Sequence, residues 1–156
     1  MAVGLPLYVV PSVNTPEKTD VIYIIGPPDP SRIEFALTLI ERGISDSLMV
    51  STPDPDDYAV CREPQTFTVY CKRPSPFTTQ GEARDLRDLS AEQGWTSATV
   101  ITMVPHVTRA RIVIERCFTG TLLMVPDTTP MSINKWVEQY VYQTAAFVKV
   151  AVNQDC

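Results

Sequence analysis

Short apolar segments that alternate with segments of helical spacing constrain the fold of this chain more than any other feature. The first, Asp20–Gly26 (DVIYIIG), is apolar almost throughout. This is typical of a central strand in a parallel sheet, because both faces of such a strand are covered. Ser47–Thr52, Ala98–Met103 and Thr121–Val125 have the same character, and Thr66–Cys71 alternates and is rich in β-branched and aromatic residues. The pattern predicts an α/β fold: a three-layer α/β/α sandwich with a mainly parallel, Rossmann-like sheet of about five strands.

The helices between these strands have recognisable beginnings and ends. Asp29 can cap the first helix, with Pro30 at its first position, and Gly43 is expected to end it. Two further helices are expected over residues 79–94 and 105–117. The last helix carries apolar residues at helical spacing: Ile133, Val137, Tyr140, Val141 and Val148.

The length and charge of the chain limit its class. A chain of 156 residues fits one domain with a single core. We expect residues 20–156 to form that domain and residues 1–19 to be a residual anchor and spacer. The net charge is −5 and the 13 Lys and Arg residues are spread along the chain. This argues against nucleic acid as a partner, because nucleic acid requires a basic face.

The N-terminal segment has two interpretations. Residues 1–11 (MAVGLPLYVVP) are apolar, but they are too short to span a bilayer and lack the basic start of a signal peptide. They could form an edge segment packed on the core. Alternatively, they are the end of a removed membrane anchor, and the polar residues that follow are the spacer between membrane and domain. The second interpretation places the domain in an oxidising compartment outside the cytoplasm.

The chain contains four cysteines, Cys61, Cys71, Cys117 and Cys156. None forms a CxxC pair, which argues against zinc. Three disulfide pairings are formally possible. We favour Cys61–Cys71, which would close a short loop, with Cys117–Cys156 tying the last helix back. The alternative is four buried thiols in a cytosolic protein, but a terminal cysteine such as Cys156 has little value as a packed thiol.

Polar residues gather at two turns within residues 76–111. In a parallel sheet both turns fall at the carboxyl ends of the strands, where ligands usually bind. We expect the strands that begin at Asp20 and Ala98 to be central neighbours, with a pocket between their carboxyl ends. The polar residues are Thr78, Thr79 and Glu82 at the first turn, and Thr102, His106 and Arg109 at the second.

His106, the only histidine, is the leading candidate for a general acid or base. A helix N-terminus disfavours its protonated form, and a neutral imidazole can act as a base or bind a ligand. Glu82 is a weaker candidate, because Thr79–Glu82 (TQGE) fits a capping box that explains both residues without chemistry. No G-x-S-x-G motif is present, and Thr78 and Thr79 are poor nucleophiles without a base beside them. The sequence lacks the ligands of a metal site, because it has one histidine and no clustered carboxylates.

Two arginines follow two of the predicted strands. Arg109 lies three positions after His106, so the two share a helical face, and Arg32 occupies a similar place after the first strand. Arginines near helix N-termini favour phosphate or carboxylate, because backbone amide donors point to the same place. We therefore expect an anion site at this edge of the sheet, although a surface arginine is the commoner outcome for any single position.

The order of these motifs resembles the YdcF-like family, which includes the SanA and ElyC envelope proteins. The resemblance covers residues 20–125, and the form with PFTTQGEAR and paired cysteines is similar to actinobacterial members with one N-terminal membrane anchor. It implies a Rossmann-like domain on the extracytoplasmic face of the cell membrane. The matching segments are DVIYIIG, Arg32, SLMVST, FTTQGEA and ITMVPHVTRA. The ligand-binding residues it implies are Gly26, Arg32, Ser51, Thr78, Thr79, Thr102 and Arg109.

Two functions of different classes remain open at this stage. The domain could be an envelope enzyme that acts on a phosphorylated substrate in peptidoglycan or envelope-polysaccharide metabolism, with His106 as acid or base. It could instead be a non-catalytic binding or regulatory module for an anionic metabolite. A weaker third alternative is an S-adenosylmethionine or nucleotide site, since S-adenosylmethionine binding has been suggested for one branch of the family. The first turn is, however, rich in proline where a cofactor would require glycine. No bound cofactor is expected.

Overall fold

A computed structural model describes residues 5–156 and shows the predicted α/β architecture. Its sheet has five strands, all parallel, in the order β3-β2-β1-β4-β5. The predicted pairing of the two central strands is confirmed, because β1 lies between β2 and β4 and Tyr23 is in register with Val100. The strands are β1 (Val21–Ile24), β2 (Ser47–Ser51), β3 (Thr68–Lys72), β4 (Ser97–Ile101) and β5 (Thr121–Met124).

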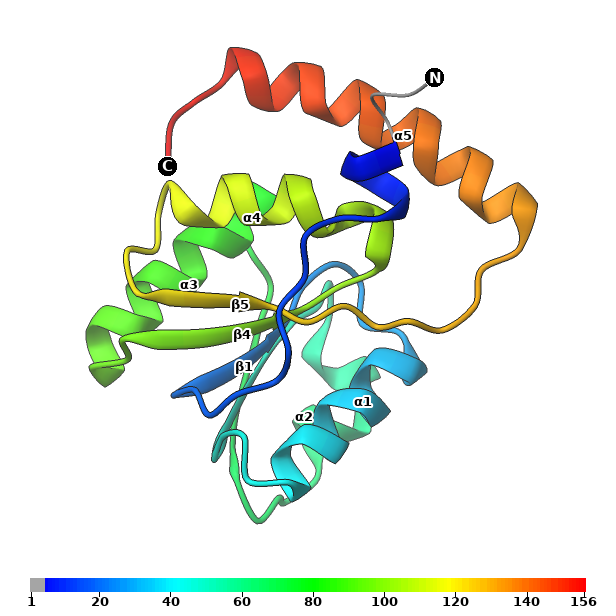
Figure 1. Ribbon diagram of the computed structural model, residues 1–156. Coiled ribbons are helices and arrows are strands. Elements are labelled where there is room, and N and C mark those ends of the chain that lie inside the picture. The colour runs from blue at the N-terminus through cyan, green and yellow to red at the C-terminus, as the bar shows by residue number, and fades with distance from the viewer. Residues whose placement is uncertain (1–4) are drawn as a thin grey trace.

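Helices cover both faces of this sheet. Figure 1 shows α3 and α4 on one face, and α1 and α2 on the other. A single 3-10 turn, Val104–His106, precedes α4 where the sequence predicted the α-helix to begin. The helices are α1 (Pro30–Glu41), α2 (Ala59–Arg62), α3 (Thr79–Gln93), α4 (Val107–Glu115) and α5 (Ile133–Val152).

Local sequence signals account for the ends of α1 and α3. Asp29 caps α1 by accepting a hydrogen bond from the Ser31 amide, and Pro30 is its first residue. Gly43 follows α1 with φ +74°, and Gly94 ends α3 with φ +75°. Only glycine adopts this left-handed conformation readily. The two glycines therefore end α1 and α3, and the chain continues into β2 and β4.

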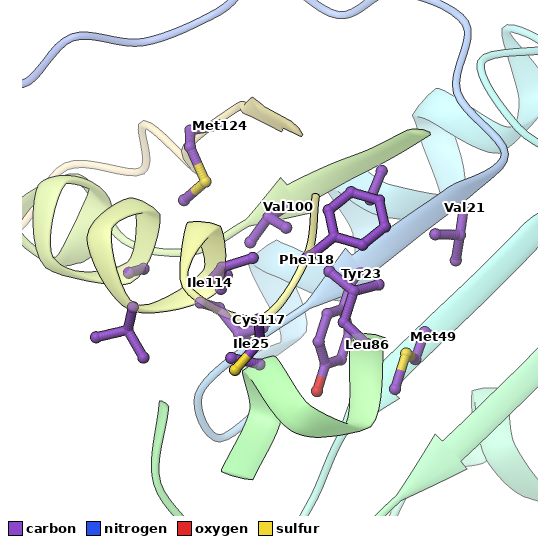
Figure 2. Packing of buried hydrophobic residues seen from close by; sticks show 14 of the residues in the cluster. Val21, Tyr23, Ile25, Met49, Leu86, Val100, Ile114, Cys117, Phe118 and Met124 are labelled. Atoms are coloured by element: carbon purple, nitrogen blue, oxygen red, sulfur yellow. The ribbon is translucent and has the colours of Figure 1, made fainter. Parts of the chain in front are cut away.

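The strand side chains alternate between two apolar clusters, one on each face of the sheet. Val21, Tyr23 and Ile25 face α3 and α4, whereas Ile22 and Ile24 face α1 and α2. Because both clusters are buried, the strands are apolar at nearly every position. Figure 2 shows the first cluster, in which Leu86 and Ile114 of the helices meet strand residues such as Val100 and Met49.

Helix α5 lies outside the sandwich, beside α4, as Figure 1 shows. Most of its apolar residues face away from the core: Ile133 is 82% exposed and Val141 is 65% exposed, whereas Val150 packs against the first cluster. The buried side chains are those of Gln139 and Gln143. The predicted last helix is confirmed, and its apolar stripe is largely exposed. The reason is that the face of α5 turned to the domain meets Arg109, which requires hydrogen-bond acceptors.

The N-terminal segment lies along the domain. Residues Leu5–Val9 form a helical turn in which Tyr8 is buried and contacts Tyr140 edge-on. The amide of Asn14 donates to the Met124 carbonyl at 2.8 Å. Residues 1–4 lie outside the described part of the chain, and the packing of residues 5–19 does not test the predicted anchor and spacer, which stay a prediction. Within residues 5–156, no helix combines the length and apolar character needed to cross a membrane.

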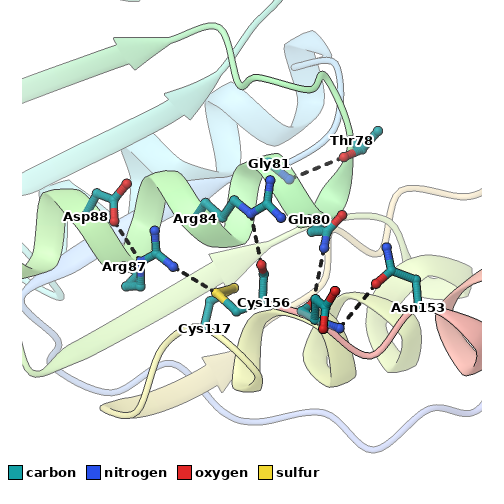
Figure 3. The surroundings of a disulfide bond; sticks show 10 residues. Thr78, Gln80, Gly81, Arg84, Arg87, Asp88, Cys117, Asn153 and Cys156 are labelled. Atoms are coloured by element: carbon teal, nitrogen blue, oxygen red, sulfur yellow. Dashed lines mark hydrogen bonds and ion pairs between the residues drawn. A yellow bond between two sulfur atoms is a disulfide. The ribbon is translucent and has the colours of Figure 1, made fainter.

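Both favoured disulfides are confirmed. Cys61–Cys71 joins α2 to β3 with a Cα–Cα distance of 5.9 Å. Cys117–Cys156 joins the end of α4 to the C-terminal residue with a Cα–Cα distance of 4.9 Å. Figure 3 shows this second disulfide beside α3, where Arg84 donates to the Cys156 carbonyl. The C-terminal tail, and with it the end of α5, is therefore fastened to the domain.

Candidate functional site

A cleft of about 390 Å³ opens at the carboxyl ends of β1 and β4. The strand order reverses between these two strands, and this is where open α/β sheets bind their ligands. All the site residues predicted from the sequence line the cleft, except Ser51, which lies buried beneath Glu82. The predicted residues at the wall are Gly26, Arg32, Thr78, Thr79, Glu82, Thr102, His106 and Arg109.

The start of α3 differs from the predicted capping box. Thr78, not Thr79, is the N-cap, and its hydroxyl accepts from the Gly81 amide at 3.3 Å. The third helical position is therefore Gly81, where an added Cβ would lie 1.9 Å from the Pro76 carbonyl oxygen. No glutamate can occupy that position, and Glu82 comes one residue too late to close the box. The capping-box prediction was wrong because two adjacent threonines made the helix start ambiguous.

Glu82 instead points into the sheet edge, with only 3% of its surface exposed. Its Oε1 accepts from the Gly26 amide and from the Ser51 hydroxyl, both at 2.6 Å. Its Oε2 has no hydrogen-bond partner within residues 5–156, and the residue lines the cleft. One carboxylate oxygen thus holds the ends of β1 and β2 together, and the other is left for a ligand or a water molecule.

The environment of Glu82 moves its pKa toward neutrality. Burial raises the pKa of this carboxyl, while the hydrogen bonds from Ser51 and Gly26 and the charge of Arg109 act in the opposite direction. A carboxyl group with a raised pKa at the wall of a cleft is suited to proton transfer. The structure therefore makes Glu82 a stronger acid–base candidate than the sequence indicated.

His106 is buried between two threonines. Its Nδ1 is hydrogen-bonded to Thr102 Oγ1 at 2.9 Å, and its Nε2 to Thr79 Oγ1 at 3.2 Å. Burial holds the pKa of His106 well below its usual range, and the charges of Arg109 and Arg32 lower it further. This environment favours the neutral imidazole, and burial rather than a helix terminus is the main cause. Such a weak base serves mainly to position the two hydroxyl groups.

His106→Gln should remove a pH dependence of stability. The folded-state pKa of His106 is depressed, so its contribution to stability is present above the unfolded pKa and is lost as the pH falls below about 6.5. The wild type should lose up to about 1.4 kcal/mol per pH unit in that range. The variant should show a flatter profile in urea unfolding between pH 7 and pH 5. Parallel profiles would mean that folding does not shift the pKa of His106.

Two arginines enter the cleft from opposite sides, and both are buried. Arg32 is 5% exposed and donates to the Ile25 carbonyl at 3.2 Å. Arg109 is 8% exposed; its Nε donates to Gln143 Oε1 at 2.8 Å and its Nη1 to Thr79 Oγ1 at 3.2 Å. Burial lowers the pKa of Arg109, although nearby Tyr142 and Glu82 oppose the shift. Both guanidinium groups are thereby held rigidly at the sheet edge.

Sequence reasoning missed the residues that α5 contributes. Gln139, Tyr142 and Gln143 line the cleft, and the Arg109 guanidinium lies 5.8 Å from the centre of the Tyr142 ring. The available signal was a pair of glutamines four residues apart in a largely apolar helix, which places them on one face. A polar pair of this kind indicates the inward face of α5, because it can satisfy a buried cation.

Comparisons with known proteins do not identify relatives of this chain. No protein-family model, no curated protein and no solved structure matches it. The functional conclusion therefore depends on the geometry and charge of the cleft.

Proposed function

We propose that this cleft binds a small anionic ligand, most simply one that carries a phosphate group. The observation that supports the proposal best is the pair of buried arginines that face the same cleft. A buried guanidinium is costly unless an anion or several hydrogen bonds compensate it. Within residues 5–156, Arg109 is bonded only to neutral groups, the side chains of Gln143 and Thr79. A bound phosphate would supply the missing negative charge.

The carboxylates near the two arginines do not neutralise them. Asp29 lies 3.6 Å from Arg32, but its side chain is 52% exposed, so water weakens this ion pair. Within residues 5–156, no carboxylate lies within ion-pair distance of Arg109. Glu82 carries at most one negative charge, and burial raises its pKa. The cleft therefore favours anions, although the whole chain has a net charge of −5.

The start of α3 adds to this preference. Thr78 and Thr79 line the cleft at the N-terminus of the helix. Unpaired amide groups and the positive end of the helix dipole attract phosphate there. The Thr79 hydroxyl is already oriented by His106 and Arg109. Together these groups would hold a tetrahedral anion from several directions.

The turn after β1 supports a simple anion rather than a nucleotide cofactor or S-adenosylmethionine. The Gly26 amide is occupied by Glu82, so it cannot bind a phosphate group. The space next to Gly26 is taken by Arg32, whose Nη1 would lie 3.4 Å from an added Cβ. A dinucleotide site needs an open, glycine-rich turn at this place. These contacts make the cofactor alternatives weaker than the anion site.

The cellular setting is proposed from the family resemblance and the disulfides. Two disulfides suit an oxidising compartment, and this agrees with a domain outside the cytoplasm, held to the membrane by an N-terminal anchor. In that setting the ligand would be a phosphorylated metabolite of peptidoglycan or envelope-polysaccharide metabolism.

Whether the domain is an enzyme depends on Glu82. With no partner for its Oε2 within residues 5–156 and a raised pKa, Glu82 could transfer a proton to or from a bound phosphoester or water molecule. Thr79 now has an imidazole beside it, but the depressed pKa of His106 makes that imidazole a poor base for activating a hydroxyl. Acid–base catalysis by Glu82 is therefore the second candidate, and a non-catalytic binding module is the alternative.

Arg109→Gln and Arg32→Gln should each weaken the binding of inorganic phosphate by about 10- to 100-fold, because each removes a charge-assisted hydrogen bond. Isothermal titration calorimetry would measure the affinities, and circular dichroism would check that the variants fold. Arg42→Gln is the matched control, since Arg42 is exposed and lies outside the cleft. Equal affinities for all four proteins would show that the anion site lies elsewhere.

A further inference from the structure

A second cavity adjoins the cleft between the start of α3 and the C-terminal half of α5. It has a volume of about 270 Å³ and shares Phe77, Arg109 and Tyr142 with the cleft. Arg109 therefore belongs to the wall that the two cavities share, and the cavities lie side by side.

This second cavity is more basic than the cleft. Among residues 5–156, its lining carries the cationic side chains of Arg109, Arg116 and Lys149 and one carboxylate, that of Asp155. Arg116 is bonded only to the backbone carbonyls of Asn153 and Val150, so no carboxylate neutralises it within residues 5–156. The excess of positive charge is notable on a chain whose net charge is −5.

Lys149 is an exposed residue in the last turn of α5. Within residues 5–156, its ammonium group makes no hydrogen bond or ion pair. Lys135, at the other end of the same helix, pairs with Glu138 at 3.3 Å. A cation without a protein partner at the wall of a basic cavity is free to pair with a ligand.

The floor of the second cavity is held in place by the C-terminal tail. Gln80 donates to the Asp155 carbonyl at 3.1 Å, and Arg116 donates to the Asn153 carbonyl at 2.8 Å. Figure 3 shows the tail running beside α3, with the Cys117–Cys156 disulfide at its end. These contacts fix the tail and the position of Arg116 at the wall of the cavity.

We infer that the ligand carries two linked acidic groups and belongs to the class of diphosphates or diphosphate esters. This inference rests on the proposed anion site and extends it. One phosphate binds between Arg32 and Arg109 in the cleft, and the second contacts Arg109 from the second cavity, toward Arg116 and Lys149. Neighbouring nitrogens of one guanidinium can bind two linked phosphates, which fits a diphosphate. The basic wall of the second cavity adds affinity for a second phosphate, so a diphosphate should bind more tightly than a ligand with a single phosphate.

The test compares inorganic pyrophosphate with inorganic phosphate by calorimetry at one low ionic strength. The wild type should bind pyrophosphate at least about tenfold more tightly, because two charged contacts are added. Lys149→Glu should reduce pyrophosphate affinity by about tenfold and leave phosphate affinity nearly unchanged. Lys135→Glu, the same charge change at the opposite end of α5, is the matched control and should change neither.

The outcomes separate this inference from the proposed function. If phosphate binds through Arg109 but Lys149→Glu has no more effect on pyrophosphate than Lys135→Glu, the inference is overturned and the anion site stands. If neither anion binds the wild type, both are overturned. Selective loss of the pyrophosphate preference in Lys149→Glu supports the diphosphate class.

Discussion

Replacing both Cys117 and Cys156 with alanine is expected to lower the free energy of unfolding by about 4 kcal/mol, because the disulfide closes a loop with a sequence separation of 39 residues. Phosphate binding should weaken as well. The disulfide fastens the tail that follows α5, and α5 supplies Gln143, the hydrogen-bond acceptor that orients Arg109. Urea unfolding and calorimetry on the same variant would measure both effects.

The other disulfide provides the control. Cys61 and Cys71 have a sequence separation of 10 residues, so replacing both with alanine should cost about 3 kcal/mol. Neither residue lines the cleft, and phosphate affinity should stay at the wild-type value. If the two double variants bind phosphate equally well, α5 does not control the geometry of the cleft.

Glu82→Ala should destabilise the protein by about 3 kcal/mol, because it leaves two buried donors without an acceptor. These donors are the Gly26 amide and the Ser51 hydroxyl, which both bind the same carboxylate oxygen. Glu82→Gln keeps an acceptor oxygen at that place, so its free energy of unfolding should be within about 1 kcal/mol of that of the wild type. Thermal and urea unfolding of the two variants would measure the difference. Equal stabilities would mean that the two hydrogen bonds contribute little.

Glu82→Gln also distinguishes the structural role of Glu82 from a catalytic role. The pKa of Glu82 is raised in the folded protein, so the stability it contributes is present at low pH and is lost as the pH rises through the folded-state pKa. Relative to the wild type, Glu82→Gln should therefore become more stable as the pH rises. It should bind phosphate at least as tightly, because a negative charge near Arg109 is removed. Loss of turnover without loss of binding would identify Glu82 as a catalytic acid or base.

The fold was predictable because its signals are local. Strands buried on both faces must be apolar at nearly every position, so segments such as Asp20–Gly26 indicated the parallel sheet directly. The cap at Asp29 and the stop at Gly43 depend on residues next to them in the chain. The convergence of His106 and Arg109 with Arg32 followed from one further rule, that the carboxyl ends of parallel strands meet at one edge of the sheet.

The start of α3 shows where local signals were ambiguous. The doublet Thr78–Thr79 offered two possible caps, and the choice between them decided whether Glu82 reached its own helix or the end of β1. The structure selects Thr78, because the chain around Pro76 approaches the helix closely enough to require glycine at position 81. A contact between residues of different elements thus changed the role of Glu82 from a cap to a wall of the cleft.

By itself, the sequence determined the layers of this protein, the pairing of its central strands and the edge at which polar residues gather. Only the tertiary structure decided which face of α5 turns inward, that Glu82 bridges Gly26 and Ser51, and that a second basic cavity adjoins the first. The physical reason is that periodicity specifies which residues of a helix share a face, but the partner across the interface decides which face is buried. For α5 that partner is Arg109, a cation that selects glutamines over valines.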